Sequence, residues 1–447
     1  MLPAETFEEY FIEAVRGRQI IDSRGNPTVE AEVFTRGGGF GRAAAPAGAS
    51  KGLHEALELR DGGPEYGGKG VKRAVYNINY IIAPRLIGLD SREQRLIDLT
   101  MIKLDGTQNK SRLGANAIVA VSLAVAKAAA NTAGLPLYAY LGGSAGTFVL
   151  PVPLMNIING GAHAGNELAI QEFMIAPIGA DTFSEALRIA IEVYQSLKLY
   201  LKEKYGPVAI NVGDEGGFAP PMKETREALT ALIEAIKRAG YEPGVDVVLG
   251  LDAAASHFYD KSSNTYHIDG KKLNPDDLLE YYISLVDEFP IRSIEDPFFE
   301  EDFGHHAELT RKIGSKVLIV GDDLYVTNLK RLEKGIDTKA TNAALLKVNQ
   351  IGTLTEAFDY AMAALQNSMK VIVSHRSGET EDTTISHIAV ALRAGLIKTG
   401  APARGERTAK YNELLRIEEE LAGSAIYAGR KTYGNIVKIF TAALDLF

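Results

Sequence analysis

The chain has 447 residues, of which 46% are hydrophobic and 23% charged, and its formal net charge is −9. Chains longer than roughly 250–300 residues usually divide into domains, and an acidic chain is a poor general partner for nucleic acid. The sequence has no cysteine, which excludes disulfides, thiolate chemistry and zinc sites built on cysteine. A small anionic substrate remains compatible with this composition, because a local pocket can be basic within an acidic protein.

Targeting and membrane segments are not visible in the sequence. Residues 1–10 are acidic and lack the apolar centre of a signal peptide. The best membrane candidate, residues 115–134, is rich in alanine and is interrupted by Asn116, Ser122, Lys127 and Asn131. Such a segment is more typical of a buried helix than of a membrane span. We therefore expect a cytoplasmic protein without a membrane partner.

The first third of the chain predicts strands followed by helices. Residues 29–34 alternate as a half-buried strand does, and Gly37, Gly38 and Gly39 predict a turn into a second strand. Helical periodicity follows at about 71–87, 92–104 and 116–131. This order is typical of an α+β domain. The small residues at 142–146 suit a linker, so we assign 1–145 to an N-terminal α+β capping domain and 146–447 to a second domain.

From about residue 150 onwards, short apolar runs alternate with helical segments. Six runs, at 247–251, 291–294, 317–320, 343–346, 371–373 and 396–397, each lead into charged residues, which from Glu295 onwards recur every 23 to 28 positions. A strand, a helix and two loops need about that length. The pattern predicts an α/β barrel built from (β/α) units, although residues 152–211 show no clean repeat. The charged residues are Asp252, Glu295, Asp322, Lys347, His375 with Arg376, and Lys398.

These strand-end residues are expected to meet at one mouth of the barrel, where such folds carry their chemistry. Charges that follow buried apolar runs are costly unless they pair with each other or bind a metal. Asp252, Glu295 and Asp322 offer the hard oxygen ligands that suit Mg²⁺. Pairing of these carboxylates with Lys347 and Lys398 is the alternative, and both arrangements can hold in part.

The lysines and the segment Ser374–Gly378 suggest the reaction. A lysine crowded by a metal and other cations is pushed toward its neutral form, which can remove a proton from carbon next to a carboxylate. Arg376 and Ser377 suit a phosphate or a second carboxylate. Taken alone, the loop acid Glu215 and the loop histidine His163 are more typical of solvated or structural residues. His305 and His306 have no convincing metal spacing, and we expect them at the surface.

Several long motifs resemble the enolase family along nearly the whole chain. They comprise residues 22–30 (DSRGNPTVE), 48–52 (GASKG), 159–166 (NGGAHAGN), 345–352 (LLKVNQIG), 374–380 (SHRSGET) and 397–402 (IKTGAP). Lys51 stands where the family often has Thr, and Ala162 where Ser is common. Neither position carries a group that the family uses for chemistry.

The resemblance implies a magnesium-dependent lyase that removes water from 2-phosphoglycerate to give phosphoenolpyruvate in glycolysis and gluconeogenesis. Lys347 would remove the C2 proton and Glu215 would protonate the departing C3 hydroxyl. Asp252, Glu295 and Asp322 would hold the first of two Mg²⁺ ions, and Ser50 would help to bind the second, which arrives with the substrate. The implied substrate contacts are His163, Gln171, Glu172, Glu295, Asp322, Lys347, His375, Arg376, Ser377 and Lys398.

The resemblance also bears on the fold, on partners and on alternatives. It implies an N-terminal α+β domain followed by a (β/α)8-type barrel whose first units depart from strict βα repetition. It implies a homodimer or a ring of dimers, with a possible second location at the cell surface. A related barrel enzyme, such as an acid-sugar dehydratase or a racemase, would lack the phosphate element with Arg376 and Ser377. An adhesion role through a C-terminal lysine is disfavoured, because the sequence given ends in Phe447.

Overall fold

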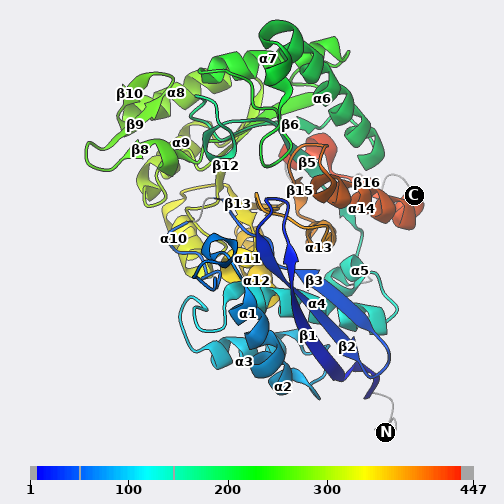
Figure 1. Ribbon diagram of the computed structural model, residues 1–447. Coiled ribbons are helices and arrows are strands. Elements are labelled where there is room, and N and C mark those ends of the chain that lie inside the picture. Colours follow the sequence, from blue (N-terminus) through cyan, green and yellow to red (C-terminus); the bar gives the residue numbers. More distant parts are fainter. Residues whose placement is uncertain (1–7, 50–51, 144–145, 434–447) are drawn as a thin grey trace.

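The computed structural model describes residues 8–49, 52–143 and 146–433 (Figure 1). Its N-terminal part contains an antiparallel sheet in which β1, β2 and β3 pair in chain order. The predicted strand at 29–34 lies within β2, and the glycine turn leads into β3 as expected. The strands span Ile12–Ile21 (β1), Pro27–Thr35 (β2) and Phe40–Ala44 (β3).

Helix α4 (Ala115–Thr132) packs along this sheet and is buried over most of its length. Of the described helices it is the one that is long and apolar enough to cross a membrane, and 83% of it is buried inside the protein. This confirms the expectation of a buried core helix. The other helices of this part are α1 (Lys72–Tyr76), α2 (Ala83–Leu86), α3 (Gln94–Asp105) and α5 (Leu137–Gly142).

The helix predicted at 71–87 is not one regular α-helix. Between α1 and α2 the residues Asn77–Ile82 form a π-helical segment. Pro84 lies in the first turn of α2 and has no N–H to donate, so the regular α-helical hydrogen-bond ladder cannot run through it.

The described residues from 146 to 433 contain the predicted barrel (Figure 1). Eight strands close in the order β11-β12-β13-β14-β15-β5-β6-β7. All six predicted apolar runs are parallel strands, and the irregular first unit is the antiparallel pair β5 and β6. The strands are β5 (Val152–Asn159), β6 (Glu172–Pro177), β7 (Val247–Asp252), β11 (Ile291–Glu295), β12 (Leu318–Gly321), β13 (Ala343–Leu346), β14 (Lys370–Ser374) and β15 (Gly395–Lys398).

Helices surround the barrel, and two small sheets lie outside it. The helices are α6 (Phe183–Tyr205), α7 (Thr225–Arg238), α8 (Pro275–Glu288), α9 (Phe303–Ile313), α10 (Leu329–Thr338), α11 (Val348–Ile351), α12 (Leu354–Gln366), α13 (Thr384–Ala391) and α14 (Gly405–Leu421). The small sheets contain β8 (Tyr259–Asp260), β9 (Thr265–Ile268) and β10 (Lys271–Leu273), and β4 (Val149–Leu150) with β16 (Ile426–Tyr427).

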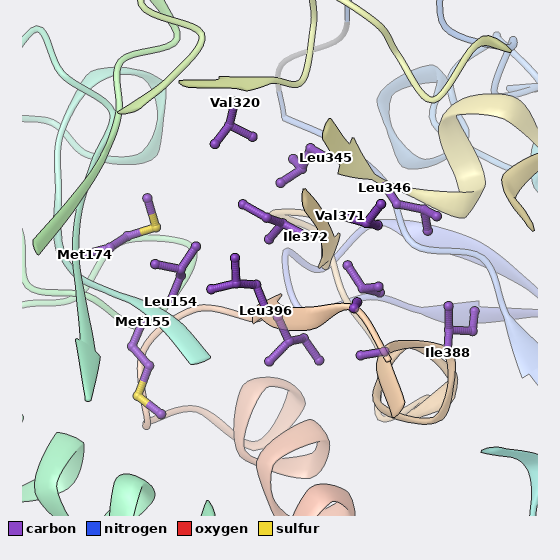
Figure 2. Close-up of a cluster of buried hydrophobic side chains, with 14 of the residues drawn as sticks. Leu154, Met155, Met174, Val320, Leu345, Leu346, Val371, Ile372, Ile388 and Leu396 are labelled. Atoms are coloured by element: carbon purple, nitrogen blue, oxygen red, sulfur yellow. The ribbon is translucent and has the colours of Figure 1, made fainter. Parts of the chain in front are cut away.

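Apolar side chains fill the barrel interior (Figure 2). Leu154 and Leu396 are 1% and 0% exposed, although they come from strands that are far apart in the sequence. In Figure 2, Leu154 and its neighbour Met155 point to opposite sides of β5, as successive residues of a strand must. Because the interior is packed, chemistry is confined to the open ends of the barrel.

Loops of the N-terminal part contact one end of the barrel. Ala47 and Gly378 exchange two backbone hydrogen bonds of 2.8 Å, and the Ser23 N–H donates to the Glu379 carbonyl at 2.7 Å. Gly378 has no room for a side chain, because a Cβ there would lie 2.7 Å from the Ala47 oxygen. The N-terminal part therefore forms one wall of the barrel mouth.

Candidate active site

Strand register places three carboxylates side by side at the mouth. Asp252, at the end of β7, is in register with Glu295 of β11 on one side and with Glu172 of β6 on the other. Because β6 runs antiparallel to its neighbours, its first residue lies where the parallel strands finish. Asp322 follows β12 by one residue, and all four carboxylates are buried.

Lys398 is the shared partner of this row. Its Nζ lies 2.9 Å from Asp252 Oδ2, 2.8 Å from Glu295 Oε2 and 3.1 Å from Glu172 Oε2. Burial alone would lower the pKa of Lys398, but these carboxylates raise it well above the ordinary value. Burial, followed by repulsion from Asp252, raises the pKa of Glu295 well above its usual range. The Lys398 ammonium group thus offsets the mutual repulsion of three carboxylates.

Lys347, at the end of β13, forms a second ion pair. Its Nζ donates to Asp322 Oδ2. Burial would raise the pKa of Asp322, yet Lys347 lowers it below its ordinary value. Burial would lower the pKa of Lys347, yet Asp322 raises it. Asp322 therefore favours the ammonium form of Lys347, and the drift toward the neutral form that is expected beside a bound metal stays a prediction.

The donor set suits a divalent cation. Carboxylates outnumber ammonium groups in a buried space, and hard oxygen donors are the ligands that Mg²⁺ prefers. Among the described residues, two groups bring candidate ligand atoms within 4.8 Å of one another, namely His163–Glu172–Glu215 and Asp296–Asp322–Asp323. Of the predicted ligands only Asp322 belongs to either group, so the trio Asp252, Glu295 and Asp322 stays a prediction.

Glu215 lies opposite these strands among two histidines. Its Oε2 accepts a hydrogen bond from Asn156 Nδ2 at 3.0 Å and lies 3.5 Å from His375 Nε2, while His163 Nδ1 is 3.7 Å from Oε1. Burial and the negative charge of Glu215 raise the pKa of Glu172 well above its usual range. Burial would also raise the pKa of Glu215, but the adjacent histidines lower it. The surroundings therefore favour the protonated form of Glu172 and the ionised form of Glu215.

Arg376 and Ser377 follow β14 and meet the N-terminal wall. Arg376 Nη1 and Nη2 donate to the two carboxylate oxygens of Glu55, each at 3.0 Å, and Nη1 lies 3.2 Å from Asn349 Oδ1. Ser377 Oγ accepts the Ala49 N–H at 2.6 Å. A buried guanidinium beside a hydroxyl provides the donors that an oxyanion needs.

These groups surround one pocket at the mouth of the barrel. Glu295 and Asp322 do not line it, but each is hydrogen-bonded to one of its lysines. Ser50 lies outside the described residues. The predicted site residues that line the pocket are His163, Gln171, Glu172, Glu215, Asp252, Lys347, His375, Arg376, Ser377 and Lys398. Gly48, Ala49 and Ser374 line it as well, although they were not predicted as site residues.

Two family models match the chain in order. "Enolase, N-terminal domain" covers residues 12–141 and "Enolase, C-terminal TIM barrel domain" covers residues 147–436. The chain belongs to the enolase family. An enolase from Methanocaldococcus jannaschii is 62% identical over 423 residues, which is 95% of this chain and 98% of that protein. An enolase from Pyrococcus furiosus is 62% identical over 422 residues, 94% and 98% of the two chains.

Family membership confirms the resemblance drawn from the motifs, and the structure adds groups that the motif analysis missed. Arg407 of α14 is fully buried and donates to His375 Nδ1, to the Arg376 carbonyl and to the Ser377 carbonyl, each at 2.6 Å. A guanidinium can only donate, so His375 Nδ1 accepts and its proton is on Nε2, facing Glu215. Arg407 thus holds the segment that carries Arg376 and Ser377.

The signal for Arg407 is its helical position. It recurs with Lys410, Tyr411, Leu414 and Ile417 on the buried face of α14. An arginine on an apolar helical stripe indicates a buried partner. Glu55, the other group missed, gave no such signal, because its partner Arg376 is 321 positions away in the sequence.

The prediction that His305 and His306 are surface residues is wrong for His306. Its side chain is 0% exposed, and Nδ1 lies 2.7 Å from the Asp302 carbonyl oxygen. The ring packs against Phe298 in a T-shaped arrangement, whereas half-buried His305 pairs with the Asp302 carboxylate. Adjacent helical residues face different directions, so one histidine is buried and the next is not.

Proposed function

We propose that this enolase-family chain catalyses the reversible dehydration of 2-phosphoglycerate to phosphoenolpyruvate. The observation that carries the proposal is the grouping of Lys347, Glu215 and Arg376 around one pocket. A base, an acid and a phosphate ligand are the three groups that this elimination requires. The family to which the chain belongs supports the assignment.

Lys347 is proposed as the base that removes the C2 proton. Its Nζ faces the pocket and is held by Asp322, so the ammonium is positioned but must first release its proton. Lys398 is proposed to face the substrate carboxylate, because it is the pocket cation closest to the carboxylate row. When bound by Asp252, Glu295 and Asp322, Mg²⁺ supplies positive charge for the substrate carboxylate as negative charge accumulates there.

Glu215 is proposed as the acid that protonates the departing C3 hydroxyl. Glu172, whose protonated form is favoured by burial, is one proton source in this cluster, and the His375 Nε2–H is a second donor nearby. His163, Gln171 and Glu172 are proposed to contact the substrate from the same side, since all three line the pocket.

Arg376 and Ser377 are proposed to bind the phosphate, and they distinguish this function from a related dehydratase or racemase acting on unphosphorylated acids. Both side chains are buried at the pocket, where bonds to a phosphate gain from exclusion of water. An adhesion role at the protein surface would not require these buried hydrogen-bond donors.

The finer parts of the proposal rest on the resemblance to the family. They are two Mg²⁺ ions per site, with Ser50 at the second, a homodimer or ring of dimers, and a cytoplasmic location with a possible second one at the cell surface. The division into residues 1–145 and 146–447 is also proposed, and the family models, which end at 141 and resume at 147, support it.

Ultraviolet monitoring of phosphoenolpyruvate formation tests the function. Purified protein with 2-phosphoglycerate and Mg²⁺ should produce the absorbing product, chelation should stop production, and added Mg²⁺ should restore it. The unphosphorylated hydroxy acid serves as the matched control and should give no product. Equal turnover of both acids, or turnover that ignores chelation, would contradict the proposal.

A further inference from the structure

A strained turn follows the predicted metal ligand Asp322. Val326 and Thr327 adopt left-handed backbone conformations, with φ of 45° and 54°. β-branched residues are disfavoured in this region, and such strain persists where the surroundings impose it, often at functional sites. Thr327 is fully buried, so its side chain is held in a fixed place.

The Thr327 hydroxyl has two partners that determine its direction. It accepts the Lys347 N–H at 2.9 Å and donates to Gln350 Oε1 at 2.8 Å. A backbone N–H can only donate, so the single hydroxyl hydrogen is left for Gln350. This fixes the orientation of the Gln350 amide, with Oε1 toward Thr327 and Nε2 away from it.

Gln350 in turn contacts the carboxylates on either side. Its Nε2 donates to Asp322 Oδ1 at 2.9 Å and lies 3.4 Å from Glu55 Oε1. The other oxygen of Asp322 accepts from Lys347, so both oxygens have assigned donors. Because Glu55 holds the Arg376 guanidinium, one amide lies between the carboxylate of the metal site and the arginine of the phosphate site.

We propose that Thr327 and Gln350 are positioning residues that fix the Asp322 carboxylate for a divalent cation and, through Glu55, hold Arg376 for the phosphate. The inference rests on the functions proposed above for Asp322 and Arg376. Neither residue lines the pocket, so each acts through its neighbours. The strained turn is explained by the need to place a hydroxyl between the Lys347 N–H and the Gln350 amide.

Titration calorimetry of Mg²⁺ into the purified full-length protein, without substrate, tests the inference. Gln350→Met keeps the length of the side chain but loses the donor to Asp322, and loss of such a partner typically weakens metal binding by about 10–100-fold. Thr327→Val keeps the shape but loses the hydroxyl, and we expect a weakening in the same direction. Thr327→Ser keeps the hydroxyl and should bind Mg²⁺ within about threefold of wild type, since the donor to Gln350 is retained.

A second titration uses inorganic phosphate at saturating Mg²⁺, where Gln350→Met should bind more weakly and Thr327→Ser as wild type. Circular dichroism and thermal unfolding establish that each metal-free variant is folded. Wild-type affinity for Mg²⁺ in folded Gln350→Met would overturn the inference. If that variant does not fold, equal affinities in Thr327→Val and Thr327→Ser would overturn it instead.

Different results would contradict the proposed metal site and the inference drawn here about Thr327 and Gln350. Wild-type protein that binds no Mg²⁺ contradicts the metal site and the inference together. Wild-type protein that binds Mg²⁺ and turns over substrate, with variants that bind equally well, contradicts the inference alone.

Discussion

Lys347 illustrates how one neighbour sets the protonation state of a proposed catalytic side chain. The lysine is buried, which favours the neutral form, but its contact with Asp322 raises its pKa. A base at this position must pass its proton on before it can accept one from carbon. The roles of Lys347 and Asp322 are therefore linked, and altering either residue changes the other.

We predict that Lys347→Ala abolishes exchange of the C2 proton. General bases typically contribute about 10²–10⁴-fold, and the other amine among the described lining residues, Lys398, is held by three carboxylates. Mass spectrometry of substrate incubated in deuterated water measures the exchange, and calorimetry should show that Mg²⁺ still binds. Lys370→Ala, at the opposite end of the barrel, is the control and should exchange normally. Normal exchange in Lys347→Ala would exclude it as the base.

We predict that Glu215→Gln separates the two halves of the reaction. Glutamine keeps the shape of the side chain but cannot donate a carboxylic proton to the leaving hydroxyl. Exchange at C2 should continue, while phosphoenolpyruvate formation falls by about 10²–10⁴-fold. Asp214→Asn, in the adjacent residue that pairs with Arg24, should retain product formation. Full dehydration by Glu215→Gln would refute the acid assignment.

At the scale of elements, α14 supports the loop that follows β14. Its buried residues Arg407 and Lys410 point at backbone carbonyls of residues 376, 377 and 380. The sequence predicted an anion site in the loop after β14. It did not predict that α14 holds this loop, because charged residues are spread along the whole of α14. Exposed Arg416 and buried Arg407 differ in their surroundings, which local composition does not encode.

We predict that Arg407→Lys weakens both folding and phosphate binding. Lysine keeps the charge but cannot reach several acceptors with one planar group, so buried carbonyls lose donors. Each lost donor costs about 1–3 kcal/mol, which urea unfolding would detect, and KM for 2-phosphoglycerate should rise. Arg416→Lys on the same helix is the control, and a variant at Arg407 that behaves like it would contradict the prediction.

At the scale of the whole molecule, six of the parallel strands were predictable because each apolar run leads into a charged residue. β6 was not, because it runs the other way and its charged residue, Glu172, precedes the apolar run. β5 carries the buried amides Asn156 and Asn159, which interrupt its apolar pattern. Sequence periodicity indicates burial but not strand direction, so the antiparallel pairing of β5 with β6 could not be predicted from it.

Burial of a histidine makes the free energy of unfolding depend on pH, and His306 allows this effect to be tested at a single residue. Burial lowers the pKa of His306 from 6.5 to about 4. Its Nδ1–H donates to a carbonyl, and among the described residues Nε2 has no hydrogen-bond partner, so protonation would create a buried charge without a partner. The unfolded chain takes up this proton more readily than the folded protein. Stability is therefore present above about pH 6.5 and is lost as pH falls toward 4.

We predict that His306→Gln removes this part of the acid sensitivity. A shift from 6.5 to about 4 corresponds to about 3 kcal/mol, so wild type should lose about 2–3 kcal/mol more than the variant between pH 7 and pH 4.5. Urea unfolding at both pH values measures the difference. His305→Gln, at the adjacent half-buried position, should keep the wild-type pH dependence. If His306→Gln and wild type lose stability in parallel, the acid sensitivity arises from other groups, and the buried His306 ring contributes packing alone.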